Sequence, residues 1–126
     1  MKRYIGLGIA MFAGAAIGAA AVSGLHAQAK LKAYTVTEQS VNDASALATY
    51  VPAVQAAVKA AGGHILNTGG RVAAIIGEAP PRVVINEWDS FDQAQAFYKS
   101  KAWMDLAPQR DKAMKIIRTY VVETVK

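Results

Sequence analysis

Two residues of this sequence could carry out acid–base chemistry, His64 and Glu87. A histidine titrates near neutral pH and can carry a proton, or it simply lies at the surface. Glu87 lies within the run Arg82–Asp89, where a carboxylate on an otherwise apolar strand face is costly unless it is paired. Glu87 is therefore the base of a pocket with a raised pKa, half of an ion pair, or both, since the two roles do not exclude each other. The possible partners in that pair are His64, Arg110 and Arg118.

Large aromatic residues follow at the end of the same run and in the segment after it, at Trp88, Phe97, Tyr98 and Trp103. They form either the hydrophobic core and a subunit interface or the walls of a cavity for a flat organic ligand. Arg110 is either a charge at a helix end or the group that recognises an anion in that cavity. We therefore expect one cavity at the end of this strand, lined by the catalytic candidates His64 and Glu87 and by the binding candidates Trp88, Tyr98, Trp103 and Arg110.

The sequence contains no motif for a metal, a cofactor or a catalytic nucleophile. It has no cysteine, and His64 is the only histidine after residue 29, so a two-histidine metal site would need two subunits. The glycine pairs at 62–63 and 69–70 lack the spacing and the lysine of a phosphate-binding loop. The serines do not lie in the context of a nucleophile elbow. We expect neither a metal nor a cofactor.

Hydrophobic periodicity predicts the elements that position these residues. Alternation predicts strands over 31–39, 64–67, 82–89 and 113–124, and the second strand is expected to resume over 71–77 after a bend at 68–70. Spacings of three and four residues predict helices over 44–61, 92–99 and 103–110. Pro52 predicts a kink or a restart in the first helix. Gly62-Gly63 is expected to end that helix, with one glycine in a left-handed conformation.

The resulting β-α-β-β-α-β order predicts a ferredoxin-like α+β sandwich, in which a four-stranded antiparallel sheet carries the helices on one face. Apolar residues occupy both faces of the last predicted strand, at Ile116, Ile117, Tyr120, Val121, Val122 and Val125. The face opposite the helices therefore needs a cover, because a large apolar patch is rarely left exposed. A second copy of the same sheet is the simplest cover, so we predict a homodimer with its sheets face to face, in the manner of an α/β barrel.

The first 29 residues follow the pattern of an export signal. Lys2 and Arg3 precede an apolar run over 4–22, and the segment ends in Ala27-Gln28-Ala29, whose small residues signal peptidase accepts. We expect a signal peptide over 1–29 and a domain over 30–126, with the mature protein in the bacterial periplasm or secreted. If the leader is not cleaved, it anchors the domain to a membrane, because the apolar run is close to the length of about 20 residues that a spanning helix needs.

The charge of the chain argues against nucleic acid as a partner. Of the 14 Lys and Arg residues, Lys2 and Arg3 belong to the leader, which leaves 12 against 9 Asp and Glu, a net charge of +3. Proteins that bind nucleic acid concentrate their basic residues on one stripe or helix. Here the basic residues are scattered, so we expect no nucleic-acid partner.

After the leader, the chain resembles the family of small bacterial proteins described as domain of unknown function 1330 (DUF1330), within the dimeric α/β-barrel superfamily. The resemblance rests on Tyr50, the glycine pairs 62–63 and 69–70, Gly77, the run Arg82–Trp88, the run Ala96–Ser100, Trp103 and Arg110. The chain departs from the family pattern at Thr68, where arginine is usual, and at Lys101, where proline is usual. If that arginine contacts a ligand in the family, its role here is either lost or taken by Arg71.

The resemblance implies a fold and a dimer, but no established activity. We expect a homodimer that binds a small apolar or aromatic molecule or acts as an interaction module, because nothing in the sequence supplies an activated nucleophile or an electron carrier. The alternative is a cofactor-free enzyme, similar to the monooxygenases and isomerases of the wider superfamily that act on aromatic or lactone substrates. A buried pair of His64 and Glu87 in a closed cavity would favour the enzyme.

Overall fold

A computed structural model of the protein describes residues 31–125, so the predicted signal peptide lies outside the described residues. The elements within this range follow one another in the order β1, α2, β2, β3, α3, α4, α5, β4. The strands are β1 (Ala33–Val41), β2 (His64–Thr68), β3 (Arg82–Trp88) and β4 (Met114–Glu123). The helices are α2 (Ala44–Ala60), α3 (Phe91–Tyr98), α4 (Lys101–Asp105) and α5 (Ala107–Ala113).

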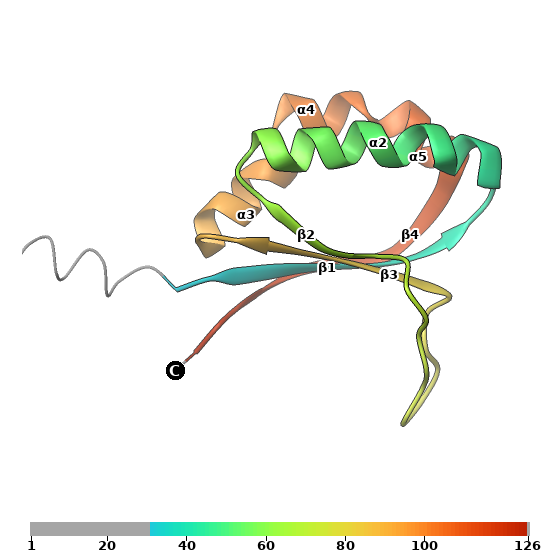
Figure 1. Cartoon of the computed structure of the whole chain (residues 1–126), viewed down its shortest axis with the longest axis horizontal. Coiled ribbons are helices and arrows are strands. Elements are labelled where there is room, and N and C mark those ends of the chain that lie inside the picture. Colours follow the sequence, from blue (N-terminus) through green and yellow to red (C-terminus); the bar gives the residue numbers. More distant parts are fainter. Residues whose placement is uncertain (1–30, 126) are drawn as a thin grey trace, which may run out of the picture. The chain divides into compact units, whose positions relative to one another are not determined.

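The strands form one antiparallel sheet in the order β2-β3-β1-β4. The predicted ferredoxin-like α+β fold is therefore confirmed. The four helices lie over the same face of the sheet, and the segment that joins β2 to β3 projects away from the opposite face (Figure 1).

Polar residues begin the helices at the points where the strand pattern breaks. Asp43 caps α2, because its Oδ1 accepts a hydrogen bond from the backbone N of Ala46 at 3.1 Å.

Pro52 lies inside α2, which nevertheless runs unbroken from Ala44 to Ala60, so the predicted restart is wrong. The helix packs one face along the sheet, and this packing outweighs the backbone hydrogen bond that a proline removes.

The last helical region is divided into two short helices. The predicted helix over 103–110 is found as α4 and α5, which meet at Leu106. Pro108 lies in the first turn of α5, where its missing N–H removes no bond within the helix. The predicted left-handed glycine after α2 is Gly62, with a φ of 90°.

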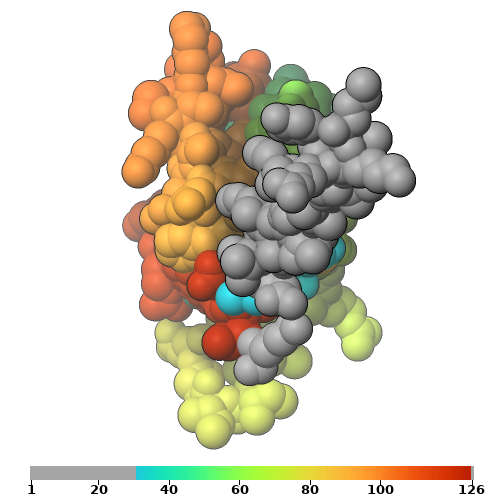
Figure 2. All heavy atoms as spheres, turned by 90° about the vertical axis from the view of Figure 1, so that its left-hand side faces the viewer, coloured from blue at the N-terminus to red at the C-terminus, as the bar shows by residue number. Residues whose placement is uncertain are grey.

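The main departure from the predicted strands is the segment over 69–81. The expected strand over 71–77 is absent, and these residues adopt no regular secondary structure. Ile75 and Ile76 are 92% and 95% exposed, because the described part of the chain offers them neither a neighbouring strand nor a core. The segment instead forms a projection at the lower end of the domain, coloured yellow-green in Figure 2.

The two faces of the sheet differ in what covers them. The inner face, which the helices cover, carries Ala33, Thr35, Thr37 and Gln39 of β1 and their partners Trp88, Asn86, Val84 and Arg82 of β3. Alternate residues of a strand point to opposite faces. The outer face therefore carries Tyr34, Val36 and Glu38 of β1, Val83, Ile85 and Glu87 of β3, and Tyr120 and Val122 of β4.

The core fills the space between the inner face and the helices. Trp88 is fully buried in a cluster with Val58 and Phe97. Its Nε1 donates a hydrogen bond to Thr35 Oγ1 at 3.1 Å, which satisfies an indole that has no access to water. A second cluster is built around Tyr50. None of the helices within residues 31–125 has the length and apolar composition that crossing a membrane requires.

Candidate functional site

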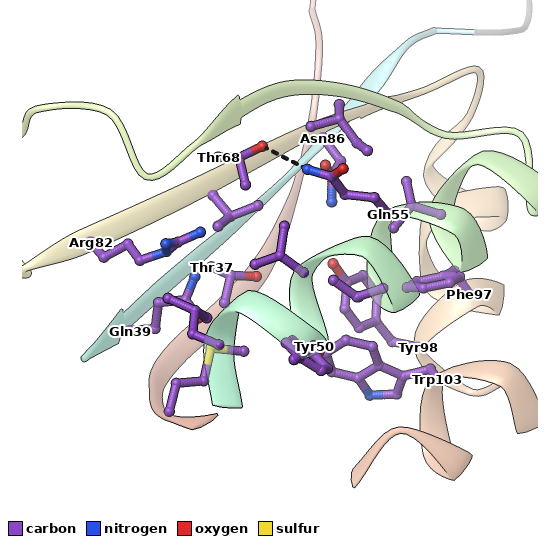
Figure 3. A pocket seen from close by; sticks show the side chains of 17 residues that line it. Thr37, Gln39, Tyr50, Gln55, Thr68, Arg82, Asn86, Phe97, Tyr98 and Trp103 are labelled. Atoms are coloured by element: carbon purple, nitrogen blue, oxygen red, sulfur yellow. Dashed lines mark hydrogen bonds between the residues drawn. The ribbon is translucent and has the colours of Figure 1, made fainter. Parts of the chain in front are cut away.

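A cavity lies between the inner face of the sheet and helix α2. The volume open to the centres of water molecules is about 50 Å³. By the same measure a single water needs roughly 10–15 Å³. The cavity therefore has room for several waters or one small organic molecule. Its wall comes from the sheet, from α2 and from the α3–α4 region (Figure 3). The wall consists of Thr37, Gln39, Leu47, Tyr50, Val51, Val54, Gln55, Val58, Ile65, Thr68, Arg82, Val84, Asn86, Phe97, Tyr98, Trp103 and Met114.

Buried polar atoms without partners are concentrated in this wall. Four buried side-chain atoms have no hydrogen-bond partner within the described residues: Gln39 Oε1, Tyr50 Oη, Arg82 Nε and Asn86 Oδ1. All four belong to residues that line the cavity. Gln39 and Tyr50 are 2% exposed and Asn86 is 6% exposed, so bulk water does not satisfy them. Such groups normally find a partner in the protein or in ordered water, so the cavity offers four unused hydrogen-bonding atoms to whatever fills it.

Arg82 supplies the charge of the cavity. Among the described residues, its guanidinium takes part in no ion pair. Burial lowers the pKa of this guanidinium from its ordinary value, because a cation is less stable away from water. An arginine nevertheless stays ionised at neutral pH, so the cavity wall carries a positive charge.

The guanidinium of Arg82 rests against Gly69, the first residue after the end of β2. A Cβ atom at position 69 would lie 2.7 Å from Arg82 Nη1, and the φ of Gly69 is 84°, in the region that favours glycine. Beside it, Thr68 Oγ1 accepts a hydrogen bond from Gln55 Nε2 at 3.4 Å (Figure 3). Gly69 therefore makes room for the charged group of the cavity.

Tyr50 offers a hydroxyl from α2. Burial is the largest influence and raises the pKa of this hydroxyl, while the nearby Arg110 guanidinium offsets part of the rise. The hydroxyl is therefore protonated at neutral pH and can donate a hydrogen bond to an occupant of the cavity.

The opposite side of the cavity is aromatic. Figure 3 places Arg82, Gln39 and Thr37 at one side and Phe97, Tyr98 and Trp103 at the other. The Phe97 ring lies edge-on to Tyr98 at a centroid distance of 5.1 Å, and Trp103 packs against both rings. The site therefore combines a charged, hydrogen-bonding side with an apolar one.

The predicted cavity that unites His64 and Glu87 with the aromatic residues is wrong in its geometry. His64 pairs with Glu87 across β2 and β3, but neither side chain lines the cavity, since Glu87 lies on the outer face and His64 is exposed. Glu87 Oε1 forms an ion pair with Lys32 Nζ at 2.6 Å. That hydrogen bond lowers the pKa of Glu87 below its ordinary value, which is the reverse of what a pocket base needs.

The remaining predicted residues are divided between the cavity and its supports. Tyr98 and Trp103 line the cavity, as expected. Trp88 does not line it and belongs to the core. Arg110 is buried behind the wall: its Cζ lies 3.8 Å from the centroid of the Trp103 ring, and its Nη1 donates a hydrogen bond to the Trp103 carbonyl at 3.2 Å. It therefore positions Trp103 and has no direct access to an occupant.

Sequence reasoning missed the polar wall of the cavity. Arg82 begins β3 directly after two prolines, where a charged residue reads as part of a turn. Thr68, one of the two positions at which the resemblance predicted a departure from the family pattern, lines the cavity. Arg71, the expected substitute, is exposed in the projecting segment, so the cation of the cavity is supplied by Arg82. The alternation of the strand is the signal that could have placed Arg82 in the cavity wall, because Arg82, Asn86 and Trp88 share one face of the strand.

A metal site is not apparent in the part of the chain that the structure describes, since no three His, Cys, Asp or Glu residues of residues 31–125 come together. The cavity wall itself holds amides, hydroxyls and one guanidinium, and no carboxylate or imidazole. These groups suit an organic molecule or an anion better than a cation.

Comparison with known proteins agrees with this fold. Residues 32–125 match the model of the family described as Domain of unknown function (DUF1330). The crystal structure of RPA0582, a protein of unknown function from Rhodopseudomonas palustris, superposes with a TM-score of 0.61 at 16% identity, over 83% of this chain and 92% of that one. A methylated form of RPA0582 gives a TM-score of 0.58 at 15% identity, over 83% and 90%.

A third solved structure is more distant. An uncharacterized NIPSNAP-like domain protein from Burkholderia xenovorans is 10% identical, with a TM-score of 0.49 over 77% of this chain and 84% of that one. At these identities the superpositions concern the fold alone. A search of curated proteins gave no match.

Proposed function

The chain belongs to the DUF1330 family, and we propose that it is an exported, homodimeric, non-catalytic protein that binds a small organic molecule between helix α2 and the sheet. The observation that carries this proposal is the gathering of the unpartnered atoms of Gln39, Tyr50, Arg82 and Asn86 in one cavity wall. Each such buried atom costs about 1–3 kcal/mol when nothing satisfies it. A bound molecule that satisfies several of them is therefore held firmly.

The composition of the wall favours binding over catalysis. The ionisable side chains that line the cavity are Tyr50, Tyr98 and Arg82, and the wall holds no imidazole and no carboxylate, the commonest general bases. The feature that would have favoured an enzyme was a buried pair of His64 and Glu87 within the cavity. Glu87 is instead paired with Lys32 on the outer face. The cavity wall therefore lacks the imidazole–carboxylate pair on which the cofactor-free enzyme alternative rested.

The outer face supports the homodimer. Val121 packs against the core, so its neighbours Tyr120 and Val122 point outward, opposite Val36 and Tyr34 of β1. The helices leave this face uncovered (Figure 1). An identical face on a second copy is self-complementary about a two-fold axis, and an interface of the standard size of about 1,600 Å² would cover it.

Charges on the outer face fit the same arrangement. Glu38 Oε1 and Arg118 Nη2 form an ion pair at 2.5 Å, so the carboxylate is already neutralised within its own chain.

The projecting segment lies on the same side of the sheet as the outer face (Figure 1). Its Ile75 and Ile76 gain a cover when a second copy lies there.

Export rests on the leader pattern of residues 1–29. N-terminal sequencing of the mature protein tests it, and the expected first residue is Lys30 or, with a cut after Ala27, Gln28. A mature protein that begins at Met1 and remains in the membrane fraction would contradict export.

Native mass spectrometry tests the binding function. The protein is purified from its natural compartment without denaturation and compared with the same sample after denaturation. We expect a small-molecule mass bound to the native dimer that is lost on denaturation. The proposal fails if the native protein carries no adduct and no compound of a broad small-molecule panel raises its melting temperature.

A further inference from the structure

We propose that the cavity recognises a small organic carboxylate, which pairs its anionic group with Arg82 and lays its apolar body toward Phe97 and Trp103. This inference rests on the proposed binding function and names the chemical class of the ligand.

The charge of the cavity is not balanced by the described chain. The wall contains one arginine and no Asp, Glu, Lys or His. The carboxylates of Glu38 and Glu87 lie on the outer face and already have partners, Arg118 and Lys32. A half-buried guanidinium without a counter-ion is unfavourable, so the occupant that suits the cavity best brings a negative charge with it.

The groups beside Arg82 suit the oxygen atoms of an anion. Gln39 lies directly opposite Arg82 in the register of β1 and β3, and both side chains face α2. Arg82 Nε and Gln39 Oε1 both lack a partner within residues 31–125. An amide can turn to present its NH₂ group, and a guanidinium holds a planar carboxylate through two parallel hydrogen bonds. The pair therefore offers several donors to one ligand group.

The rest of the cavity limits the anion to one that is small and singly charged. A single guanidinium balances a carboxylate, whereas a phosphate group at neutral pH carries about 1.5 to 2 negative charges and has only one cation to meet it. Away from Arg82 the wall is formed by aliphatic side chains of α2 and by Phe97, Tyr98 and Trp103. A short aliphatic or single-ring body fills that side and buries apolar surface.

Isothermal titration calorimetry with matched probes tests the proposal. Sodium benzoate and sodium hexanoate are compared with the neutral benzamide and with inorganic phosphate, on the wild-type protein at pH 7. Benzoate and hexanoate are expected to bind at least about tenfold more tightly than benzamide, the loss expected for one charge-assisted hydrogen bond. Phosphate is expected to bind more weakly than either carboxylate.

Two arginine variants locate the effect. Arg82→Gln removes the charge within the cavity, while Arg71→Gln removes the same charge from the exposed projecting segment. We expect Arg82→Gln to abolish the preference of the protein for benzoate over benzamide, and Arg71→Gln to leave it unchanged. Circular dichroism and the melting temperature establish that each variant is folded, and the benzoate–benzamide comparison on the wild type does not depend on any variant.

The outcomes separate this inference from the proposed function. If benzamide binds as tightly as benzoate, or if both arginine variants keep the preference, the carboxylate assignment is overturned while binding in the cavity stands. If phosphate is preferred, the ligand is a phosphorylated molecule and the assignment is likewise overturned. If no probe binds and the native protein carries no adduct, the proposed function fails together with the inference.

Discussion

Arg82 and Gln39 lie directly opposite each other on neighbouring strands, yet Arg82 Nε and Gln39 Oε1 have no hydrogen-bond partner within residues 31–125. Two polar side chains in this position would ordinarily bond to each other or to the chain around them. Their free atoms border the same cavity as the Tyr50 hydroxyl and the Asn86 amide. The inner face of the sheet thus keeps a polar site opposite the aliphatic side chains of α2.

The contact between Gly69 and Arg82 gives the first prediction. Gly69→Ala places a Cβ against the guanidinium and also forces a positive φ on alanine. We expect a loss of about 1 kcal/mol in the free energy of unfolding and weaker binding of benzoate. Gly77→Ala is the matched control, because Gly77 has a φ of 77° but nothing within 4 Å of its Cβ position.

Urea denaturation and benzoate titration of the two glycine variants decide this point. We expect Gly69→Ala, and not Gly77→Ala, to change the affinity for benzoate. An equal change in Gly77→Ala would mean that the effect comes from backbone strain and not from the position of Arg82.

The hydroxyl of Tyr50 gives the second prediction. Tyr50→Phe removes a buried oxygen that has no partner in the described chain, while the ring keeps its packing. The free energy of unfolding of the ligand-free protein should therefore stay the same or rise by about 1 kcal/mol. Ligand binding should weaken if the hydroxyl donates to the occupant. A clear loss of stability in the ligand-free variant would show that the hydroxyl has a structural partner.

The outer face gives the third prediction. Tyr120→Glu places a charge opposite Val36, in the middle of the proposed dimer interface. Sedimentation velocity at micromolar concentration should show a dimer for the wild type and a monomer for this variant. Met104→Glu changes an apolar residue on α4, in the helix layer, that is 58% exposed against 43% for Tyr120, and this variant should remain dimeric. A wild-type monomer, or a dimeric Tyr120→Glu variant, would rule out this interface.

The outer-face carboxylates give the fourth prediction, which concerns pH. The hydrogen bond from Arg118 holds the pKa of Glu38 below its ordinary value of 4.5, and the hydrogen bond from Lys32 does the same for Glu87. A carboxylate with a lowered pKa in the folded state stabilises the protein at pH above 4.5. That stabilisation is lost as the pH falls below 4.5 and through the lower pKa of the folded state.

Urea denaturation between pH 3 and pH 7 measures this loss. The wild type should lose stability with acid more steeply than the double variant Glu38→Gln, Glu87→Gln. Identical slopes for the two proteins would contradict the role given to these ion pairs.

Much of this architecture could be predicted from the sequence because it depends on local patterns. The alternation in β3 and the three-and-four spacing in α2 set the type and order of the elements, and residues such as Asp43 mark where helices begin. The projecting segment could not be predicted in the same way. Its run of apolar residues reads as a strand, but no strand of the described sheet pairs with it.

The site was harder to predict because periodicity does not say which face of a strand the helices cover. Val83 and Ile85 make the outer face of β3 as apolar as a core face. Glu87 shares that face, so the sequence pattern predicted a place for it in the cavity. The fully buried Trp88 shows which face of β3 is the inner one. Because alternate residues share a face, Arg82 and Asn86 point inward together with Trp88. The absence of a partner for Arg82 is a property of the assembled sheet and helix, which the sequence alone does not reveal.

The central claim is that the cavity between α2 and the sheet holds the ligand. A crystal structure of the protein with benzoate bound tests it most directly. We expect the carboxylate within hydrogen-bond distance of the Arg82 guanidinium, with the ring directed toward Phe97 and Trp103. A ligand seated on the outer face, or a cavity that contains only water at saturating benzoate, would contradict the claim.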